Sequence, residues 1–78
     1  MITRRYKVVL EWDDEACVWV TTVPALNGLS TYGETRDEAI AQTRDAIIGY
    51  LEELQQEGLS PPEAPGDVDL VEVEVAVA

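Results

Sequence analysis

Hydrophobic residues in the first part of the chain recur at every second position, which is the period of a β-strand. The run from Tyr6 to Trp12 alternates apolar and polar side chains, so it predicts a half-buried strand. A second run, residues 17–23, is apolar or β-branched on both sides. Because residues 13–15 make a short acidic turn between the runs, the two runs predict an antiparallel hairpin. A third, short strand is predicted at residues 29–32.

The next stretch, residues 36–57, changes to the period of an amphipathic α-helix. Its apolar residues recur at spacings of seven, four and three: Ile40, Ile47, Leu51 and Leu54. These spacings place the side chains along one stripe, so the helix is predicted to bury a single face. Gly49 inside the helix lowers helix stability by about 1 kcal/mol relative to alanine. We expect a close packing contact to explain why glycine occupies this position.

Turn and cap residues bracket this helix. Thr35 and Glu38 fit a capping box, in which the threonine hydroxyl accepts a hydrogen bond from the Glu38 amide. Gly58 fits the left-handed residue that ends a helix, and Leu59 is placed to complete a Schellman motif. The residues predicted to shape the turns and helix ends are Pro24, Gly28, Gly33, Thr35, Glu38 and Gly58.

After a proline-rich connection the chain returns to strand period. Residues 69–77 alternate valine with other side chains, which predicts a fourth strand with one apolar face. The element order is therefore β-β-β-α-β. We expect an α+β domain in which one helix covers one face of a small antiparallel or mixed sheet.

One helix leaves the other face of such a sheet uncovered, and the second strand is apolar on both sides. Uncovered apolar patches usually mark interfaces, so we expect a homodimer or a higher homo-oligomer. The alternative is that residues 59–68, or the end of the helix, fold over the patch. The residues predicted to mediate self-association are Val18, Trp19, Val20 and Thr21.

Length, charge and residue usage narrow the classes of function. The 78 residues are enough for one domain, and 16 acidic residues against 5 basic ones give a formal net charge of −11. This charge repels phosphate backbones, so we expect no direct nucleic-acid contact, whereas a basic protein partner is plausible. The cluster of Arg4, Arg5 and Lys7 is interpreted as a solubilising strand end or as ion pairing to a neighbouring subunit. No long apolar run predicts a membrane segment, so a cytoplasmic protein is expected.

Candidate catalytic groups are few. Glu11, Asp13 and Asp14 lie at the end of the first strand, where carboxylates could hold metal ions, but aspartates in a hairpin turn commonly bond to their own backbone. The chain has no histidine, and Cys17, its single cysteine, has no evident activator. We therefore expect no enzyme activity, no catalytic residues, no metal site and no cofactor.

The ordered set of motifs between Tyr6 and Pro65 resembles the HicB-type antitoxin domain. The family pattern is a hairpin ending in valine-proline, a glycine-centred turn, a Gly-acidic-Thr sequence, an acidic-Glu-Ala helix start and a Gly-x-x-x-Pro exit. In this sequence these features are Val23-Pro24, Asn27-Gly28, Gly33-Glu34-Thr35, Asp37-Glu38-Ala39, and Gly58 followed by Pro61 and Pro62. The resemblance covers about four-fifths of the chain.

The resemblance implies a degraded ribonuclease-H-like fold and a type II toxin–antitoxin system. It implies a non-catalytic module that binds and blocks a small basic HicA-type toxin, which cleaves mRNA. Acidic residues on the outer side of the helix are either an ordinary solvated face or the candidates for that contact: Asp45, Glu52, Glu53 and Glu57. The alternative is a stand-alone homo-oligomeric scaffold or small-ligand-binding domain without a toxin. Many family members add a DNA-binding domain, whereas here we expect a single domain over residues 1–78.

Overall fold

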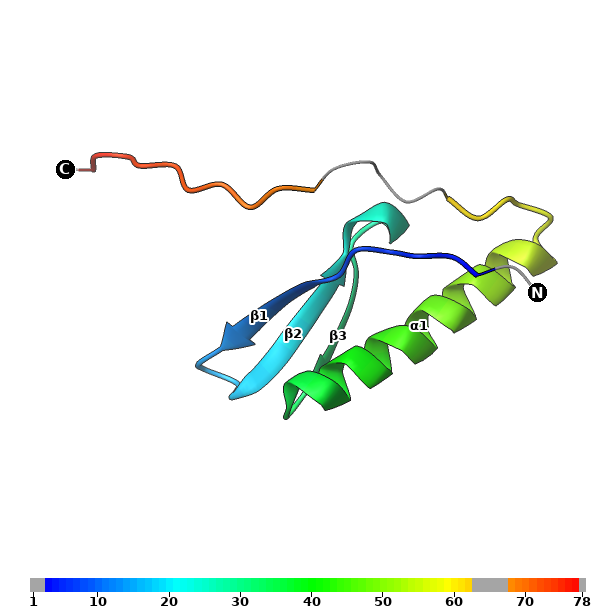
Figure 1. Ribbon diagram of the computed structural model, residues 1–78, viewed down its shortest axis with the longest axis horizontal. Helices are drawn as coiled ribbons and strands as arrows, with labels where there is room; N and C mark the ends of the chain where they lie inside the picture. Colours follow the sequence, from blue (N-terminus) through cyan, green and yellow to red (C-terminus); the bar gives the residue numbers. More distant parts are fainter. Residues whose placement is uncertain (1–2, 63–67, 78) are drawn as a thin grey trace.

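Three strands and one long helix form the body of the protein. The computed structural model describes residues 3–62 and 68–77. The elements in order are β1 (Val9–Asp13), β2 (Val18–Val23), a 3₁₀ turn (Pro24–Leu26), β3 (Leu29–Gly33) and α1 (Arg36–Gln56). Figure 1 shows α1 running alongside the three-stranded sheet. The predicted α+β class, with three strands followed by one helix, is confirmed.

The sheet is an antiparallel meander in the order β1-β2-β3, so β1 and β3 are its two edge strands. The register places Trp12 opposite Trp19 and Thr21 opposite Thr31. Because side chains alternate across a strand, these four residues share one face, whereas Val18, Val20 and Thr22 of β2 point to the other. We call the first the helix face and the second the outer face.

The core lies between the helix face and α1. Val23, Leu26 and Ala39 are buried there, with relative exposures of 0 to 1%. The helix packs mainly on β3 and, to a lesser extent, on β2. The side of the helix face nearest β1 is therefore less covered than the side nearest β3.

Both ends of α1 form as the sequence predicts. The Thr35 hydroxyl oxygen accepts a hydrogen bond of 3.1 Å from the Glu38 amide. At the other end Gly58 adopts φ +75°, its amide donates to the Gln55 carbonyl at 3.1 Å, and the Leu59 amide donates to the Leu54 carbonyl at 2.9 Å. These two bonds are the Schellman pair that satisfies the last helical carbonyls.

The close approach of backbone to backbone occurs at Gly33 rather than at Gly49. A Cβ atom on Gly33 would lie 2.8 Å from the Cα atom of Ala39 and nearer still to its amide nitrogen, so the start of α1 packs directly on the end of β3. A Cβ atom on Gly49 would meet nothing within 4 Å. The expectation of a packing contact at Gly49 is therefore wrong.

The hairpin turn differs from its predicted form. Cys17 belongs to the turn rather than to β2, is exposed, and takes a left-handed φ of 56°.

The Asp13 carboxylate accepts hydrogen bonds from the amides of Glu15 and Ala16 at 3.0 and 3.2 Å. The interpretation of Asp13 as a turn residue that bonds its own backbone is confirmed.

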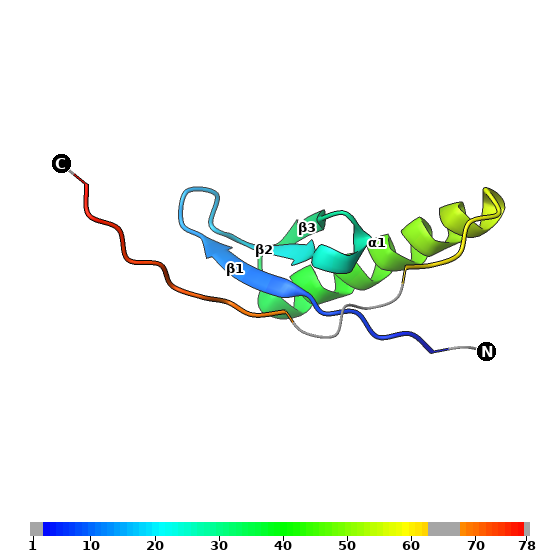
Figure 2. The same cartoon turned by 90° about the horizontal axis from the view of Figure 1, so that it is seen from above.

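The predicted fourth strand is not formed in the single chain. Residues 69–77 belong to no sheet, and the exposed fractions of Leu70 and the four valines lie between 71% for Val75 and 89% for Val77. Figures 1 and 2 show this segment, which we call the C-terminal tail, running away from the body. The alternation predicts an extended chain, but a strand also needs a neighbour to pair with.

Candidate partner-binding site

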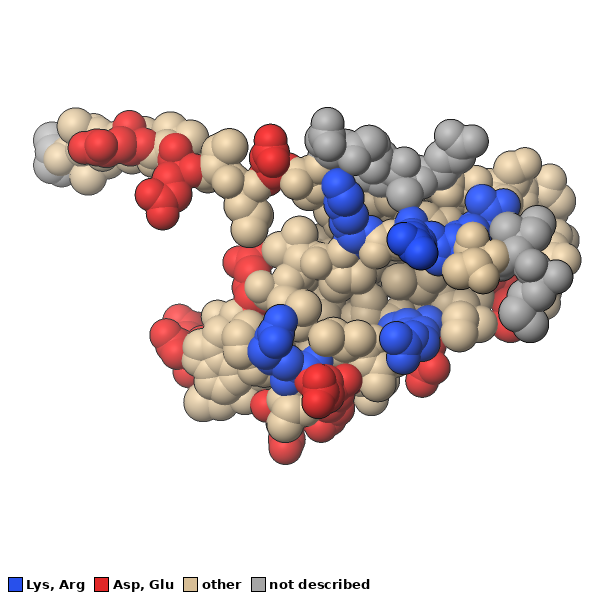
Figure 3. All heavy atoms as spheres, in the orientation of Figure 1, with Lys and Arg blue, Asp and Glu red and all other residues tan. Residues whose placement is uncertain are grey.

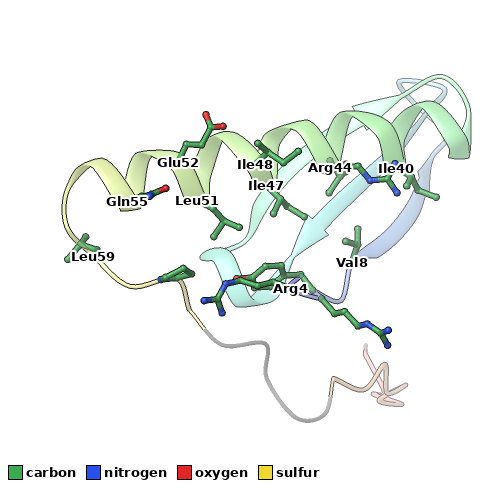
Figure 4. A pocket seen from close by; sticks show the side chains of 14 residues that line it. Arg4, Val8, Ile40, Arg44, Ile47, Ile48, Leu51, Glu52, Gln55 and Leu59 are labelled. Carbon is green, nitrogen blue, oxygen red and sulfur yellow. The ribbon is translucent and has the colours of Figure 1, made fainter. Parts of the chain in front are cut away.

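An open groove lies between α1 and the N-terminal residues 4–8. Its volume is about 980 Å³. The apolar part of its lining comes from both sides: Val8, Ile40, Ile47, Ile48, Leu51, Leu59 and Pro61. Figure 4 shows Ile47 and Leu51 directed from α1 toward the N-terminal residues. The groove exists because the helix packs over β3 and β2, so that one flank of its apolar stripe extends beyond the edge at β1.

The groove is apolar yet accessible. Ile48 is 48% exposed and Leu59 54% exposed, both in the groove wall. Large aliphatic side chains contribute about 1.5–3 kcal/mol each when they pass from water to a fully apolar environment. The groove is thus a surface whose burial by another chain is energetically favourable.

Basic side chains line the same groove, although the chain as a whole is strongly acidic. Arg4, Arg5 and Arg44 contribute to the lining, which is three of the five basic residues in the sequence. Figure 3 shows basic side chains gathered on this face, with acidic ones on the C-terminal tail and around the margins. The local field of the groove therefore favours a negatively charged occupant.

A side-chain hydrogen bond fixes one end of the groove. The Tyr6 hydroxyl donates to the carbonyl of Pro62 at 2.9 Å, which joins residues 56 positions apart. Tyr6 and Pro61 both line the groove. This bond holds the N-terminal residues against the chain that leaves the helix.

The outer face of the sheet is a second uncovered surface. Val18, Val20 and Tyr32 line a shallow hollow of about 450 Å³ there. Tyr32 is 68% exposed and lies opposite Val20 in the register. Among the described residues, no helix packs on this face, because α1 occupies the other side (Figure 2). The sequence also allowed residues 59–68 to fold over this patch, and that segment lies partly outside the described residues.

The four residues predicted to mediate self-association do not share one face. Val18 and Val20 lie on the outer face, but Thr21 has 0% exposure and contacts α1 through its hydroxyl. Trp19 also lies on the helix face, where its ring meets Trp12 edge-on at 5.6 Å and carries the Arg36 guanidinium at 5.6 Å from its centroid. The 0% exposure of Thr21 in the single chain argues against Thr21 as an intersubunit contact, whereas the self-association role of the half-buried Trp19 stays a prediction.

The acidic candidates on α1 and at its C-cap, Glu57, are all exposed, and they form two rows. Asp45 and Glu52 are seven residues apart and lie on nearly the same side of the helix. Glu53 and Glu57 are four residues apart and lie about 100° further round. Glu52 is at the rim of the groove, and its carboxylate points away from the N-terminal residues in Figure 4. The sequence placed these acids on the surface correctly but did not resolve them into rows.

Comparison with known proteins identifies the family. The family model described as "HicB_like antitoxin of bacterial toxin-antitoxin system" matches residues 6–76. The chain belongs to the HicB-like antitoxin family. A curated relative, UPF0150 protein Ta0767 of Thermoplasma acidophilum, is 36% identical over 52 residues, which are 67% of this chain and 74% of that protein. No solved structure matches the chain.

Family membership gives this HicB-like chain the antitoxin side of a toxin–antitoxin system, with a toxin as the implied partner. Members of this family are regulatory modules and are generally non-catalytic. Among residues 3–62 and 68–77, no group of three or more carboxylate, cysteine or histidine side chains is placed to hold a metal ion. In the same residues, no helix combines the length and apolar character that crossing a bilayer requires.

A buried cluster of three threonine hydroxyls joins the sheet of this HicB-like chain to its helix. The Oγ1 atoms of Thr21 and Thr31 lie 2.6 and 2.7 Å from that of Thr43, and 2.8 Å from each other. The Thr43 hydroxyl donates to the Ala39 carbonyl at 2.7 Å, so its oxygen is free to accept from the other two. All three hydroxyl protons thus have acceptors, as buried polar groups require.

Sequence reasoning missed this cluster, and the convergence of Arg44 with the N-terminal arginines on the groove, for the same reason. The three threonines come from β2, β3 and α1, and they meet only once the register of the sheet is known. Thr43 carried a weak signal, since it is a hydrogen-bonding side chain on the apolar stripe of a helix. Arg44 carried none, because its position on the helix matches an ordinary solvated residue.

Proposed function

We propose that this HicB-like chain is a non-catalytic antitoxin that binds a small, basic, mRNA-cleaving toxin of the HicA type and blocks it by steric cover. Charge is the observation that supports this proposal most directly. The net charge of −11, together with exposed carboxylates on both rows of α1, matches a basic partner. Opposite potentials raise the encounter rate and fix the orientation of two proteins.

We assign the toxin contact to the acidic rows, Asp45 with Glu52 and Glu53 with Glu57. The groove does not suit a basic partner, because three arginines line it. The acidic rows lie outside it or at its rim, where a toxin can bind without meeting those arginines. A cytoplasmic location, a type II system and kinship with ribonuclease-H-like folds are parts of the same proposal.

We assign self-association to the outer face of the sheet, through Val18 and Val20 with Tyr32. The valines are half-buried and the tyrosine is exposed in the single chain, so a second sheet packed face to face would remove apolar area from water. This assignment keeps two of the four residues that the sequence suggested and replaces the other two.

Co-expression with the product of a neighbouring basic reading frame, followed by pull-down, tests the toxin assignment. The variant Asp45→Lys/Glu52→Lys is expected to weaken capture by roughly tenfold or more, because it replaces attraction with repulsion. The variant Glu53→Lys/Glu57→Lys tests the second row in the same way. The matched control Gln42→Lys/Gln56→Lys adds positive charge at exposed helix positions without removing an acid, and is expected to retain more of the capture.

Two results would count against the antitoxin assignment. One is a complex that neither charge reversal weakens relative to the glutamine control. The other is the absence of any basic reading frame beside the gene, which favours the stand-alone scaffold or small-ligand binder. The volume of the groove gives that alternative a specific site, since pockets of 300 to about 1,000 Å³ suit small ligands.

A further inference from the structure

The C-terminal tail and the groove both lack a partner among the described residues of the single copy. The tail exposes its valines on one side and carries acids between them. The groove offers an apolar lining with arginines. We propose that the C-terminal tail of a second copy docks as a strand along the groove, so that two copies exchange tails.

Charge complementarity favours this occupant. The tail contributes Asp69, Glu72 and Glu74, whereas the groove contributes three arginines. The positive potential of the groove arginines therefore favours a negatively charged strand.

Hydrophobic pattern and length also agree. Alternate residues of a strand point to the same side, so Val71, Val73, Val75 and Val77 form one apolar row. The row from Val71 to Val77 spans six residue steps, about 20 Å at about 3.3 Å each. The part of the groove lining on α1 runs from Ile40 to Gln55, about 22 Å at 1.5 Å per residue. The row of valines is therefore as long as the apolar wall that would cover it.

The free edge of the sheet supplies the backbone partner. β1 is an edge strand, and within the described residues its outer side is not paired. Such an edge is a template for strand addition, in which main-chain hydrogen bonds supply affinity and side-chain pockets supply specificity. Val8, just before β1, already lines the groove, so an added strand at this edge lies over the groove wall.

A second copy fits better than the tail of the same copy. The tail of the same copy starts beyond Pro62, which Tyr6 holds by its hydroxyl. In Figures 1 and 4 the N-terminal residues lie between that tail and α1, and the tail runs away from the body. A tail arriving from another copy approaches the open side of the groove without crossing these residues. Exchange of identical elements is a low-cost route to a dimer.

Cysteine pairs between separate full-length chains test the exchange directly. In a Cys17→Ser background, one chain carries Val73→Cys and the other carries Ile48→Cys, both at exposed positions. We expect mild oxidation of the mixture to give a disulfide-linked heterodimer, measured by mass spectrometry and a non-reducing gel. Its yield should exceed by roughly tenfold that obtained when Gln42→Cys, on the far side of α1, replaces Ile48→Cys.

A charge exchange provides an independent measurement. Full-length Glu72→Arg/Glu74→Arg and full-length Arg4→Glu/Arg44→Glu each place like charges between tail and groove, so each should associate roughly tenfold more weakly than wild type in sedimentation velocity. Mixing the two restores complementarity in both directions, and we expect the mixture to recover the wild-type association.

Two outcomes overturn the exchange. One is a heterodimer yield no higher than that of the Gln42→Cys control. The other is a chain with both Ile48→Cys and Val73→Cys that closes on itself while the mixed single variants do not cross-link, which shows that the tail fills its own groove. Neither result bears on toxin capture, and Val18→Asp/Val20→Asp separately tests the outer face. Failure of the exchange and failure of the proposed function are therefore distinguishable.

Discussion

Strand β2 and the C-terminal tail are both rich in valine, yet they have opposite environments. Val23 in β2 has 0% exposure, whereas Val73 in the tail is 77% exposed. The difference is the number of neighbours: β2 has a strand on each side and a helix on one face, and the tail, as far as the structure describes it, has none of these. Hydrophobic alternation therefore indicates that a segment can form a strand. Whether it does depends on the strands and helices available to pair with it and cover it.

Among the substitutions, the largest change in the free energy of unfolding is expected where the start of α1 packs on the end of β3. Gly33→Ala places a Cβ atom 2.8 Å from the Ala39 Cα atom, so β3 and α1 must separate, and we expect a loss of about 3 kcal/mol in the free energy of unfolding. Gly49→Ala is the matched control, because its Cβ meets nothing within 4 Å. It should stabilise the helix by about 1 kcal/mol in the same urea titration. Equal effects at both sites would contradict the close contact at Gly33.

A direct comparison of the two valine segments comes next. Val23→Ala removes buried methyl groups from the core and should lower the free energy of unfolding by about 2.5 kcal/mol. Val73→Ala removes the same groups from an exposed position and should change it by less than about 0.5 kcal/mol. Both values are measured by urea titration at a protein concentration where the chain is dissociated. A large loss for Val73→Ala at that concentration would mean that the tail packs on its own body.

The third effect tests the hydroxyl cluster that joins β2 and β3 to the helix. Thr43→Val keeps the shape of the side chain but removes the oxygen on which Thr21 and Thr31 converge, and we expect a loss of about 2 kcal/mol. Thr43→Ser keeps the hydroxyl and should lose less. Thermal unfolding of the two variants gives the ranking, and a reversed order would contradict a role for the hydrogen bonds.

Local signals in the sequence predicted the parts of the fold that local interactions determine. Thr35 and Glu38 at one end of α1, and Gly58 with Leu59 at the other, formed the expected bonds because each motif involves residues close in sequence. The positions of Trp19 and Thr21 depended instead on which face of the sheet the helix covers. Alternation defines two faces but does not label them, so the sequence could not separate the helix face from the outer face.

The candidate site was predictable only in part for a related reason. The exposed acids of α1 were found from helical period alone. The groove was not, since Arg4, Arg44 and Leu59 are far apart in the sequence and converge through the packing of α1 on the sheet. The sequence left two interpretations of the N-terminal arginines, a solubilising strand end or ion pairing to a neighbouring subunit. The tail exchange offers a specific geometry in which to test the second.

The hydrogen bond from Tyr6 to Pro62 has a consequence for any assembly that the tail builds. It anchors the point from which the chain leads to the tail, and the six residue steps from Pro62 to Val68 span at most about 22 Å. The point from which the chain leaves toward the tail is thus held at one end of the groove by one phenol. In the proposed exchange, the separation of two joined copies is therefore limited by this single aromatic ring together with the short stretch of chain that follows it.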